Sequence, residues 1–215
     1  DPLMARKLEL NFEARLGEIT VMIDAGGAPK SDDINFLADT IERAPVDLQT
    51  GNVGQFVALT RVVIDGNNVL NGLNDNRWTH SGIRLGNNVY VMGGEGISTI
   101  EKVVLPNDGG FDDGDGGLGT FTRAGDLPQA RNRLSVIALF GTAYVYGGWN
   151  GTFLTTVESA SIVGDALGTF TPDGVVTLGV GLENGTPLLT NSAVYLFGGT
   201  DGTTRPYIQR GLIAP

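Results

Sequence analysis

The densest group of candidate metal ligands is a run of aspartates set among glycines in residues 107–117. Alternating Asp and Gly can place carboxylate and backbone oxygens around Ca²⁺, which takes six to eight oxygen ligands. The spacing departs from the EF-hand loop, because Ala124 and Gly119 stand where loops starting at Asp113 and Asp108 would need Glu. The segment predicts either a Ca²⁺ site, the single cofactor suggested by the sequence, or a flexible acidic hairpin tip. Its candidate ligands are Asp108, Asp112, Asp113 and Asp115.

A second set of charged residues recurs along the chain at fixed places. Glutamates occupy one recurring position and arginines another, with Arg77 at a roughly comparable place. A catalytic group is normally present once, so the recurrence predicts structural Glu–Arg pairs that tie neighbouring repeats, and no catalytic residue. Gln209 in the last copy would keep a hydrogen bond and lose the charge. The predicted structural residues are Glu42, Glu101, Glu158, Arg6 and Arg131.

Other residue types restrict the chemistry further. Cysteine is absent, which excludes thiol catalysis, disulfides and zinc-thiolate sites. A Ser-His-Asp relay would have to use His80, the single histidine, and no Gly-x-Ser-x-Gly turn supplies a nucleophile. Asn150 and Asn184 open Asn-Gly-Thr sequons, which suit either N-glycosylation or hairpin turns. Trp149 could stack on a sugar ring or pack between elements of the fold.

The elements that must position these residues form an internal repeat. Gly pairs, each preceded by an apolar run, begin at residues 26, 93, 147 and 198, so they are 67, 54 and 51 residues apart. A Thr-Ile-Glu-like segment follows each pair, and a Leu-Gly-Thr-Phe-like segment follows in the first three copies. The apolar runs at 88–92, 143–146 and 193–197 are rich in β-branched and aromatic residues, which predicts equivalent buried strands on successive sheets.

These phrases resemble the kelch family in its bacterial form, most clearly over residues 77–199. The resemblance implies an all-β chain of kelch-like β-propeller blades, each a four-stranded antiparallel sheet, with repeats at about 1–76, 77–125, 126–177 and 178–215 in a single domain. It implies no single activity. A copper site like that of kelch-fold galactose oxidase is excluded, because that site needs more than one His and a Cys. The last repeat lacks its outer strand, so the chain is expected to self-associate or to belong to a longer chain.

Composition limits the partners and the compartment. The net charge is −10 and the pI is about 4.4, which opposes binding to nucleic acid or to anionic membranes. No apolar run approaches the roughly 18 residues needed for a membrane span. An acidic, Gly-rich β-protein without cysteine is typical of extracellular or cell-surface locations, and we expect that compartment here.

Together these features favour a non-enzymatic binding or structural module of a cell-surface, appendage or virion protein. The partner would be a protein or a glycan, held by loops on one propeller face. The alternative is a secreted carbohydrate-processing enzyme, which needs unlike polar groups converging on one site. The residues that follow the Gly pairs discriminate between the two: unlike polar groups there favour the enzyme, and like residues favour the scaffold.

Overall fold

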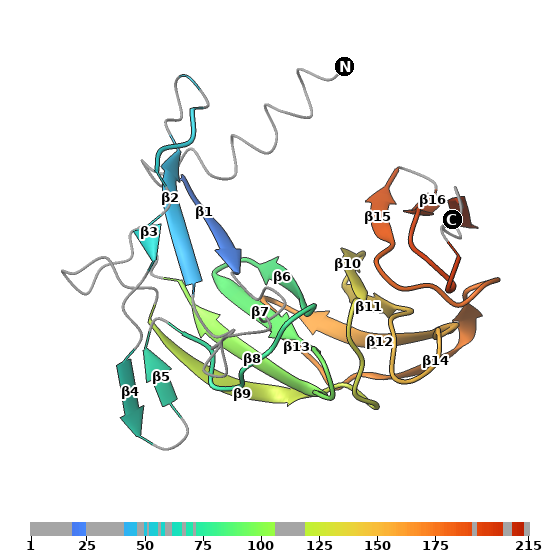
Figure 1. Ribbon diagram of the computed structural model, residues 1–215, viewed down its shortest axis with the longest axis horizontal. Coiled ribbons are helices and arrows are strands. Elements are labelled where there is room, and N and C mark those ends of the chain that lie inside the picture. The colour runs from blue at the N-terminus through green and yellow to red at the C-terminus, as the bar shows by residue number, and fades with distance from the viewer. Residues whose placement is uncertain are drawn as a thin grey trace. The chain divides into compact units, whose positions relative to one another are not determined.

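The computed structural model describes the backbone of residues 19–24, 41–46, 50, 52–55, 57–58, 62–65, 68–70, 72–105, 119–190, 193–203 and 208–212. Side chains are described from residue 72 onward within these ranges, and at residues 50 and 52–55. Every regular element in this part of the chain is a β-strand, so the all-β prediction is confirmed there (Figure 1). The described residues include no helix of the length and apolarity that crossing a membrane requires. Arg6 and the four aspartates of the acidic segment lie outside the described residues, and for Glu42 only the backbone is described.

The chain divides into two compact units, and the first comprises residues 1–76 and 103–122. Its strands β1 (Ile19–Asp24), β2 (Ile41–Val46) and β3 (Val57–Ala58) form an antiparallel sheet in that order. Strands β4 (Val62–Asp65) and β5 (Asn68–Leu70) form a hairpin. β5 pairs with Thr120 and Phe121, the first two residues of β9 (Thr120–Asp126).

The second unit comprises residues 77–102 and 123–215 and holds three successive sheets. The first contains β6 (Ser81–Leu85), β7 (Asn88–Met92), β8 (Thr99–Val104) and β9 (Thr120–Asp126), side by side in that order, and it continues through β5 and β4 as a six-stranded sheet. The last two residues of β8 and the first three of β9 belong to the first unit. The next contains β10 (Ser135–Leu139), β11 (Thr142–Tyr146), β12 (Thr156–Val163), the short β13 (Ala166–Leu167) and β14 (Thr171–Thr177), with both β13 and β14 paired to β12. The third contains β15 (Thr186–Leu189), β16 (Ala193–Phe197) and β17 (Ile208–Leu212).

The three predicted strands occupy equivalent places in these sheets. β7, β11 and β16 each lie second in a separate sheet, as the apolar runs before the Gly pairs predict. Consecutive Tyr90, Val91 and Met92 are all buried, so β7 is covered on both faces. Every strand pair with a described register is antiparallel, in agreement with the short connections between strands.

The first strands of the three sheets follow one another in space. β10 contacts β6 on one side and β15 on the other. The main core lies where the β6–β9 sheet meets the β10–β14 sheet, and includes Tyr90, Met92, Val145 and Phe170. Two backbone hydrogen bonds join successive sheets at matching places: Gly94 N donates to Arg131 O at 2.9 Å, and Gly148 N donates to Leu182 O at 2.8 Å. The sheets are therefore repeated units that pack on one another in sequence order.

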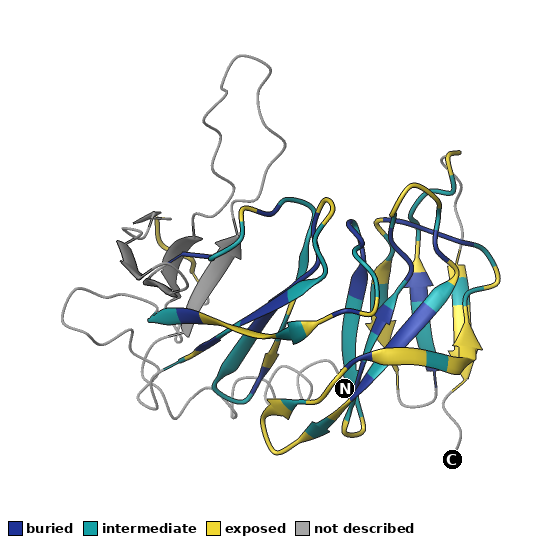
Figure 2. Ribbon diagram, turned by 90° about the horizontal axis from the view of Figure 1, so that it is seen from below, coloured by how far each residue is buried: buried dark blue, intermediate teal, exposed yellow. Residues whose placement is uncertain are grey.

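Burial decreases toward the last sheet. The β15–β17 sheet exposes several large apolar side chains, and the region around the C-terminus is largely yellow in Figure 2. The corresponding face of the β6–β9 sheet is buried by its neighbour.

Candidate functional site

Two buried Arg–Glu pairs lie beside the Gly pairs with the same geometry. Arg77 Nη1 donates to Gly93 O at 2.8 Å, and its Nη2 donates to Glu101 Oε1 at 2.7 Å. Arg131 Nη1 donates to Gly147 O at 2.8 Å, and its Nη2 donates to Glu158 Oε1. The arginine side chains are fully buried and the glutamates nearly so.

Each pair lies within one repeat, which corrects one expectation from the sequence. Arg77 precedes β6 and Glu101 lies on β8 of the same sheet, and Arg131 and Glu158 are related in the same way. At this position the tie between neighbouring repeats comes from the backbone, because the Arg131 carbonyl accepts from Gly94 N. The arginine thus links the Gly pair and the third strand of its own sheet.

Burial dominates the electrostatics of the Arg131–Glu158 pair. Burial raises the pKa of Glu158, and the attraction and hydrogen bond of Arg131 oppose that rise. Burial likewise lowers the pKa of Arg131, opposed by Glu158. Glu158 Oε2 is buried and has no hydrogen-bond partner among the described residues. The pair is therefore enclosed and mutually dependent, which suits a structural part better than an acid or base that meets a substrate.

The last repeat replaces both members of the pair together. Leu182 stands 16 residues before Gly198, as Arg131 stands 16 before Gly147, and Gln209 replaces the glutamate. Gln209 Oε1 accepts from Gly179 N at 2.8 Å, and its Nε2 donates to Val180 O at 3.1 Å. Sequence reasoning anticipated the neutral Gln209 but missed Leu182, which the fixed spacing to the Gly pair could have revealed.

A repeated backbone feature lies two residues after Arg77, Arg131 and Leu182. Thr79, Arg133 and Asn184 have φ of 56°, 51° and 57°, the left-handed region that non-glycine residues rarely adopt. Arg133 N donates to Thr79 O at 2.6 Å, and Asn184 N donates to Arg133 O at 2.9 Å. One chain of backbone hydrogen bonds thus runs across three successive repeats, while the three side chains differ completely.

The neighbouring positions also differ from repeat to repeat. The residue before the left-handed position is Trp78, Asn132 or Glu183, and the residue after the Gly pair is Glu95, Trp149 or Thr200. Backbone bridges hold Asn132 opposite Trp149 and Glu183 opposite Thr200. These nine residues lie on one shared framework, and we call five of them the polar cluster: Glu95, Asn132, Arg133, Trp149 and Glu183.

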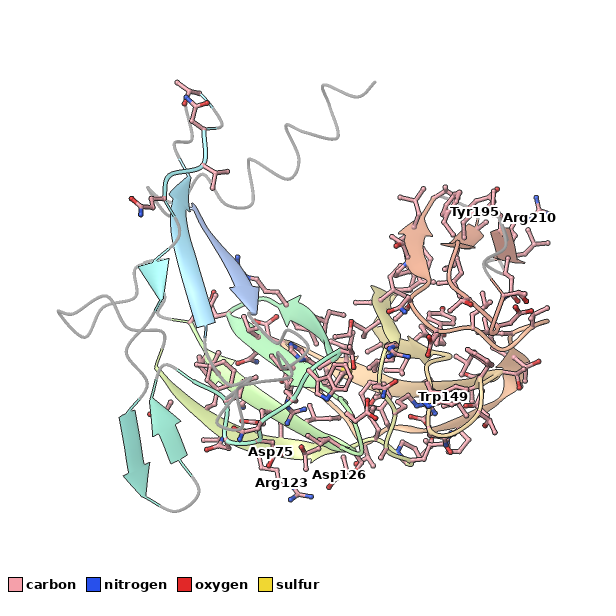
Figure 3. The ribbon with its side chains drawn as sticks, viewed as in Figure 1. Asp75, Arg123, Asp126, Trp149, Tyr195 and Arg210 are labelled. Atoms are coloured by element: carbon pink, nitrogen blue, oxygen red, sulfur yellow. The ribbon has the colours of Figure 1, made fainter. Side chains whose placement is uncertain are left out.

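Side chains of the polar cluster contact one another across repeats. Asn132 Nδ2 donates to Glu95 Oε2 at 2.6 Å, and Arg133 Nη1 donates to both carboxylate oxygens of Glu183 at 3.0 and 2.9 Å. Asn132 Oδ1 is buried without a hydrogen-bond partner in the described part of the chain. Trp149 is half-buried, and its ring meets Phe153 edge to face at a centroid distance of 4.7 Å (Figure 3). The cluster combines carboxylate, guanidinium, amide and indole groups, which suits polar recognition together with stacking.

The other predicted residues are spread over the second unit. Asn150 and Asn184 are both exposed, as acceptors of glycosylation must be. His80 directly precedes β6. No cluster of acidic or histidine side chains able to hold a metal occurs among the described residues, and the predicted Ca²⁺ ligands lie outside them.

Comparisons with known proteins add little to these observations. No protein-family profile and no curated protein matches the chain. Among solved structures, the chain is similar to that of YjhT, with 15% sequence identity and a TM-score of 0.44. The match covers 57% of this chain and 34% of the YjhT chain, so this chain spans about a third of that structure.

Proposed function

We propose that this chain is a non-enzymatic binding module built from kelch-like β-propeller blades. One observation carries the proposal: the shared backbone framework presents unlike side chains, and both of its carboxylates are already engaged across repeats, Glu95 by Asn132 and Glu183 by Arg133. A rigid frame that holds unlike residues in fixed positions is the usual design of a recognition surface.

The propeller arrangement is supported by how the sheets follow one another. First strands β6, β10 and β15 are neighbours in order, and equivalent backbone hydrogen bonds join successive Gly pairs to the next repeat. Radial packing brings first strands together in this way, whereas a sandwich of two sheets would not place three sheets in series.

The proposed partner is a protein or a glycan at the cell surface or outside the cell. A half-buried Trp beside carboxylate and amide groups can stack on a sugar ring while the polar groups bind hydroxyls. The net charge of −10 disfavours nucleic acid and anionic lipid as partners.

The test is binding to a panel of glycans and extracellular domains with two variants of the polar cluster. Trp149→Ala should weaken binding about tenfold or more, because aromatic anchors dominate recognition surfaces. Glu95→Gln keeps an oxygen for the Asn132 amide and removes the charge, so it should weaken binding about two- to tenfold without unfolding the chain.

The matched control is Asp126→Asn, which removes an exposed carboxylate that is not part of the polar cluster. Asp126 forms an ion pair with Arg123 at 2.7 Å. Binding should be unchanged in this variant. A wild-type chain that binds nothing on the panel, or one that binds equally after both cluster substitutions, would contradict the proposal.

A carbohydrate-processing enzyme is the second candidate, favoured by the unlike polar groups that follow the Gly pairs. Against it, both carboxylate oxygens of Glu183 accept hydrogen bonds from Arg133, so this carboxylate is committed to a contact between repeats. Any glycan that binds should therefore be recovered intact after prolonged incubation. Release of a product that Glu95→Gln or Glu183→Gln abolishes would establish the enzyme instead.

A further inference from the structure

The two carboxylates of the polar cluster differ in how they are neutralised. Glu183 is buried, and both of its oxygens accept hydrogen bonds from the guanidinium of Arg133. Glu95 is exposed, and its Oε2 accepts from the neutral amide of Asn132 at 2.6 Å. No cationic side chain in the part of the chain that the structure describes pairs with Glu95. The negative charge of Glu95 is therefore the one that the cluster leaves without a counter-charge.

Trp149 lies on the same face as Asn132. The two residues exchange both backbone hydrogen bonds, Asn132 N to Trp149 O at 3.0 Å and Trp149 N to Asn132 O at 2.9 Å. Residues paired in this way project their side chains to the same face, with Cβ atoms about 5 Å apart. Because the Asn132 amide contacts Glu95, the indole and the carboxylate flank one amide group.

Phe153 holds the indole in place from the side. Its ring meets Trp149 edge to face with centroids 4.7 Å apart, and a Cβ added at Gly202 would come within 3.2 Å of the Phe153 ring. Gly202 has a φ of 94° and lies on the loop that follows the next Gly pair. The loop of one repeat thus supports the aromatic pair of the preceding repeat, so Trp149 presents its exposed part in a fixed orientation.

The Asn132 amide has an unmatched acceptor. Asn132 is 3% exposed, and its Oδ1 has no hydrogen-bond partner among the described residues. Buried polar atoms of folded proteins are nearly always paired, so an unpaired oxygen next to an exposed carboxylate indicates a place for a donor. The unpaired polar atoms of this site are both acceptors, Asn132 Oδ1 and the second oxygen of Glu95. A group that carries only donors matches them better than a sugar hydroxyl, which is donor and acceptor at once.

We propose that Glu95, Asn132 and Trp149 bind an arginine side chain of a partner protein. This inference rests on the proposed function and selects a protein partner within it. The guanidinium forms an ion pair with Glu95, and its flat face stacks on Trp149. Because the Glu95 side chain is exposed, it can turn toward the ligand, which opens the Asn132 amide beside it to a further N–H. Arginine suits the site better than lysine, because a guanidinium donates in its own plane while its face stacks.

The charge of the whole chain favours the same kind of partner. A net charge of −10 attracts a basic protein surface over about 8–10 Å at physiological salt. A neutral glycan gains nothing from this attraction, and an acidic glycan is repelled. Binding of the arginine should therefore weaken as the salt concentration rises.

The test compares N-acetyl-arginine methylamide with N-acetyl-citrulline methylamide, in which a neutral urea of the same shape replaces the guanidinium. Each probe is titrated into the ¹⁵N-labelled full chain, and NMR follows the indole N–H of Trp149 and the side-chain amide of Asn132. The arginine probe should shift both signals with a Kd of about 10 mM or lower, and the citrulline probe should bind about tenfold more weakly. Glu95→Gln should weaken binding of the arginine probe about tenfold and remove most of the difference between the two probes. Since Glu95 is exposed, this variant should remain folded.

Asp165→Asn is the matched control, because it removes an exposed carboxylate on the turn between β12 and β13. The Asn88 amide donates to Asp165 O at 2.6 Å, at the opposite end of β7 from Gly93, so binding should be unchanged in this variant. Equal binding of the two probes, or no shift of either signal at about 50 mM arginine probe, would overturn the proposal. If a glycan of the panel bound through Trp149 and the arginine probe did not displace it, the arginine site would be wrong and the proposed function would stand.

Discussion

Replacing Arg131 with leucine is expected to lower the free energy of unfolding by about 3–5 kcal/mol at neutral pH, because the buried Glu158 carboxylate loses the guanidinium that pairs with it. Gly147 O loses a hydrogen-bond donor as well. Urea denaturation of the wild type and the variant measures the difference.

The loss of unfolding free energy caused by Arg131→Leu should become smaller as the pH falls. Burial already raises the pKa of Glu158 in the folded chain, and removal of Arg131 removes the interaction that opposes this rise. A carboxyl group whose folded pKa is raised stabilises the fold below its unfolded pKa, and that contribution is lost as the pH rises through the folded value. The Arg131→Leu variant should therefore be least destabilised near pH 4 to 5 and most destabilised above the folded pKa.

Two further variants separate charge burial from packing. Glu158→Gln leaves the Arg131 guanidinium unpaired, and because arginine stays protonated, its destabilisation should not diminish in acid. The double variant Arg131→Leu with Glu158→Gln has the residues that the last repeat carries at these positions, Leu182 and Gln209. Its loss of unfolding free energy should be much smaller than the sum of the losses in the two single variants. If the double variant lost as much unfolding free energy as the two single variants together, or if the loss in Arg131→Leu did not change with pH, the two residues would not be a coupled buried pair.

Gly147→Ala is the second change with a large expected effect, a loss of about 3 kcal/mol or more in the free energy of unfolding. Gly147 has a φ of 56°, and an added Cβ would overlap the carbonyl oxygen of Leu182 in the next repeat. Gly198 is the equivalent residue of the last pair, with a φ of 65°, and a Cβ there would meet nothing within 4 Å.

Gly198→Ala therefore serves as the matched control. It should cost only the backbone strain of the left-handed region, about 1 kcal/mol. The difference between the two variants measures how closely successive repeats approach at the Gly pair. Equal losses would mean that the repeats do not pack at this point as described, and thermal unfolding of both variants gives the comparison.

The sequence predicts the strands because their pattern is local. Apolar runs before the Gly pairs locate β7, β11 and β16, since β-branched and aromatic residues bounded by turn residues suffice to indicate a buried strand. The kelch resemblance predicts a β-propeller. The described structure contains antiparallel sheets in series, and the propeller arrangement remains a proposal.

The candidate site was less predictable for a physical reason. Recurrence identified the Arg–Glu positions, but the same period relates Arg131 to Glu158 in its own repeat and to Glu101 in the preceding one, so spacing does not choose the partner. The sequence pointed to the residues that follow the Gly pairs, and so to Glu95 and Trp149, but it did not single out Asn132, Arg133 and Glu183, because the equivalent positions of other repeats carry other residue types. Thr79, Arg133 and Asn184 all stand 14 residues before the first glycine of their Gly pair, but the spacing alone does not show their shared positive φ or the hydrogen bonds that join them.

The central claim is that this chain is an array of equivalent sheets that pack on one another in sequence order. Amide hydrogen exchange followed by NMR tests it most directly, because Gly94 N and Gly148 N each donate a hydrogen bond to a carbonyl of the next repeat. The account predicts that both amides exchange slowly in the wild type and that Gly147→Ala speeds exchange at Gly148. Fast exchange of both amides in the folded wild type would contradict it.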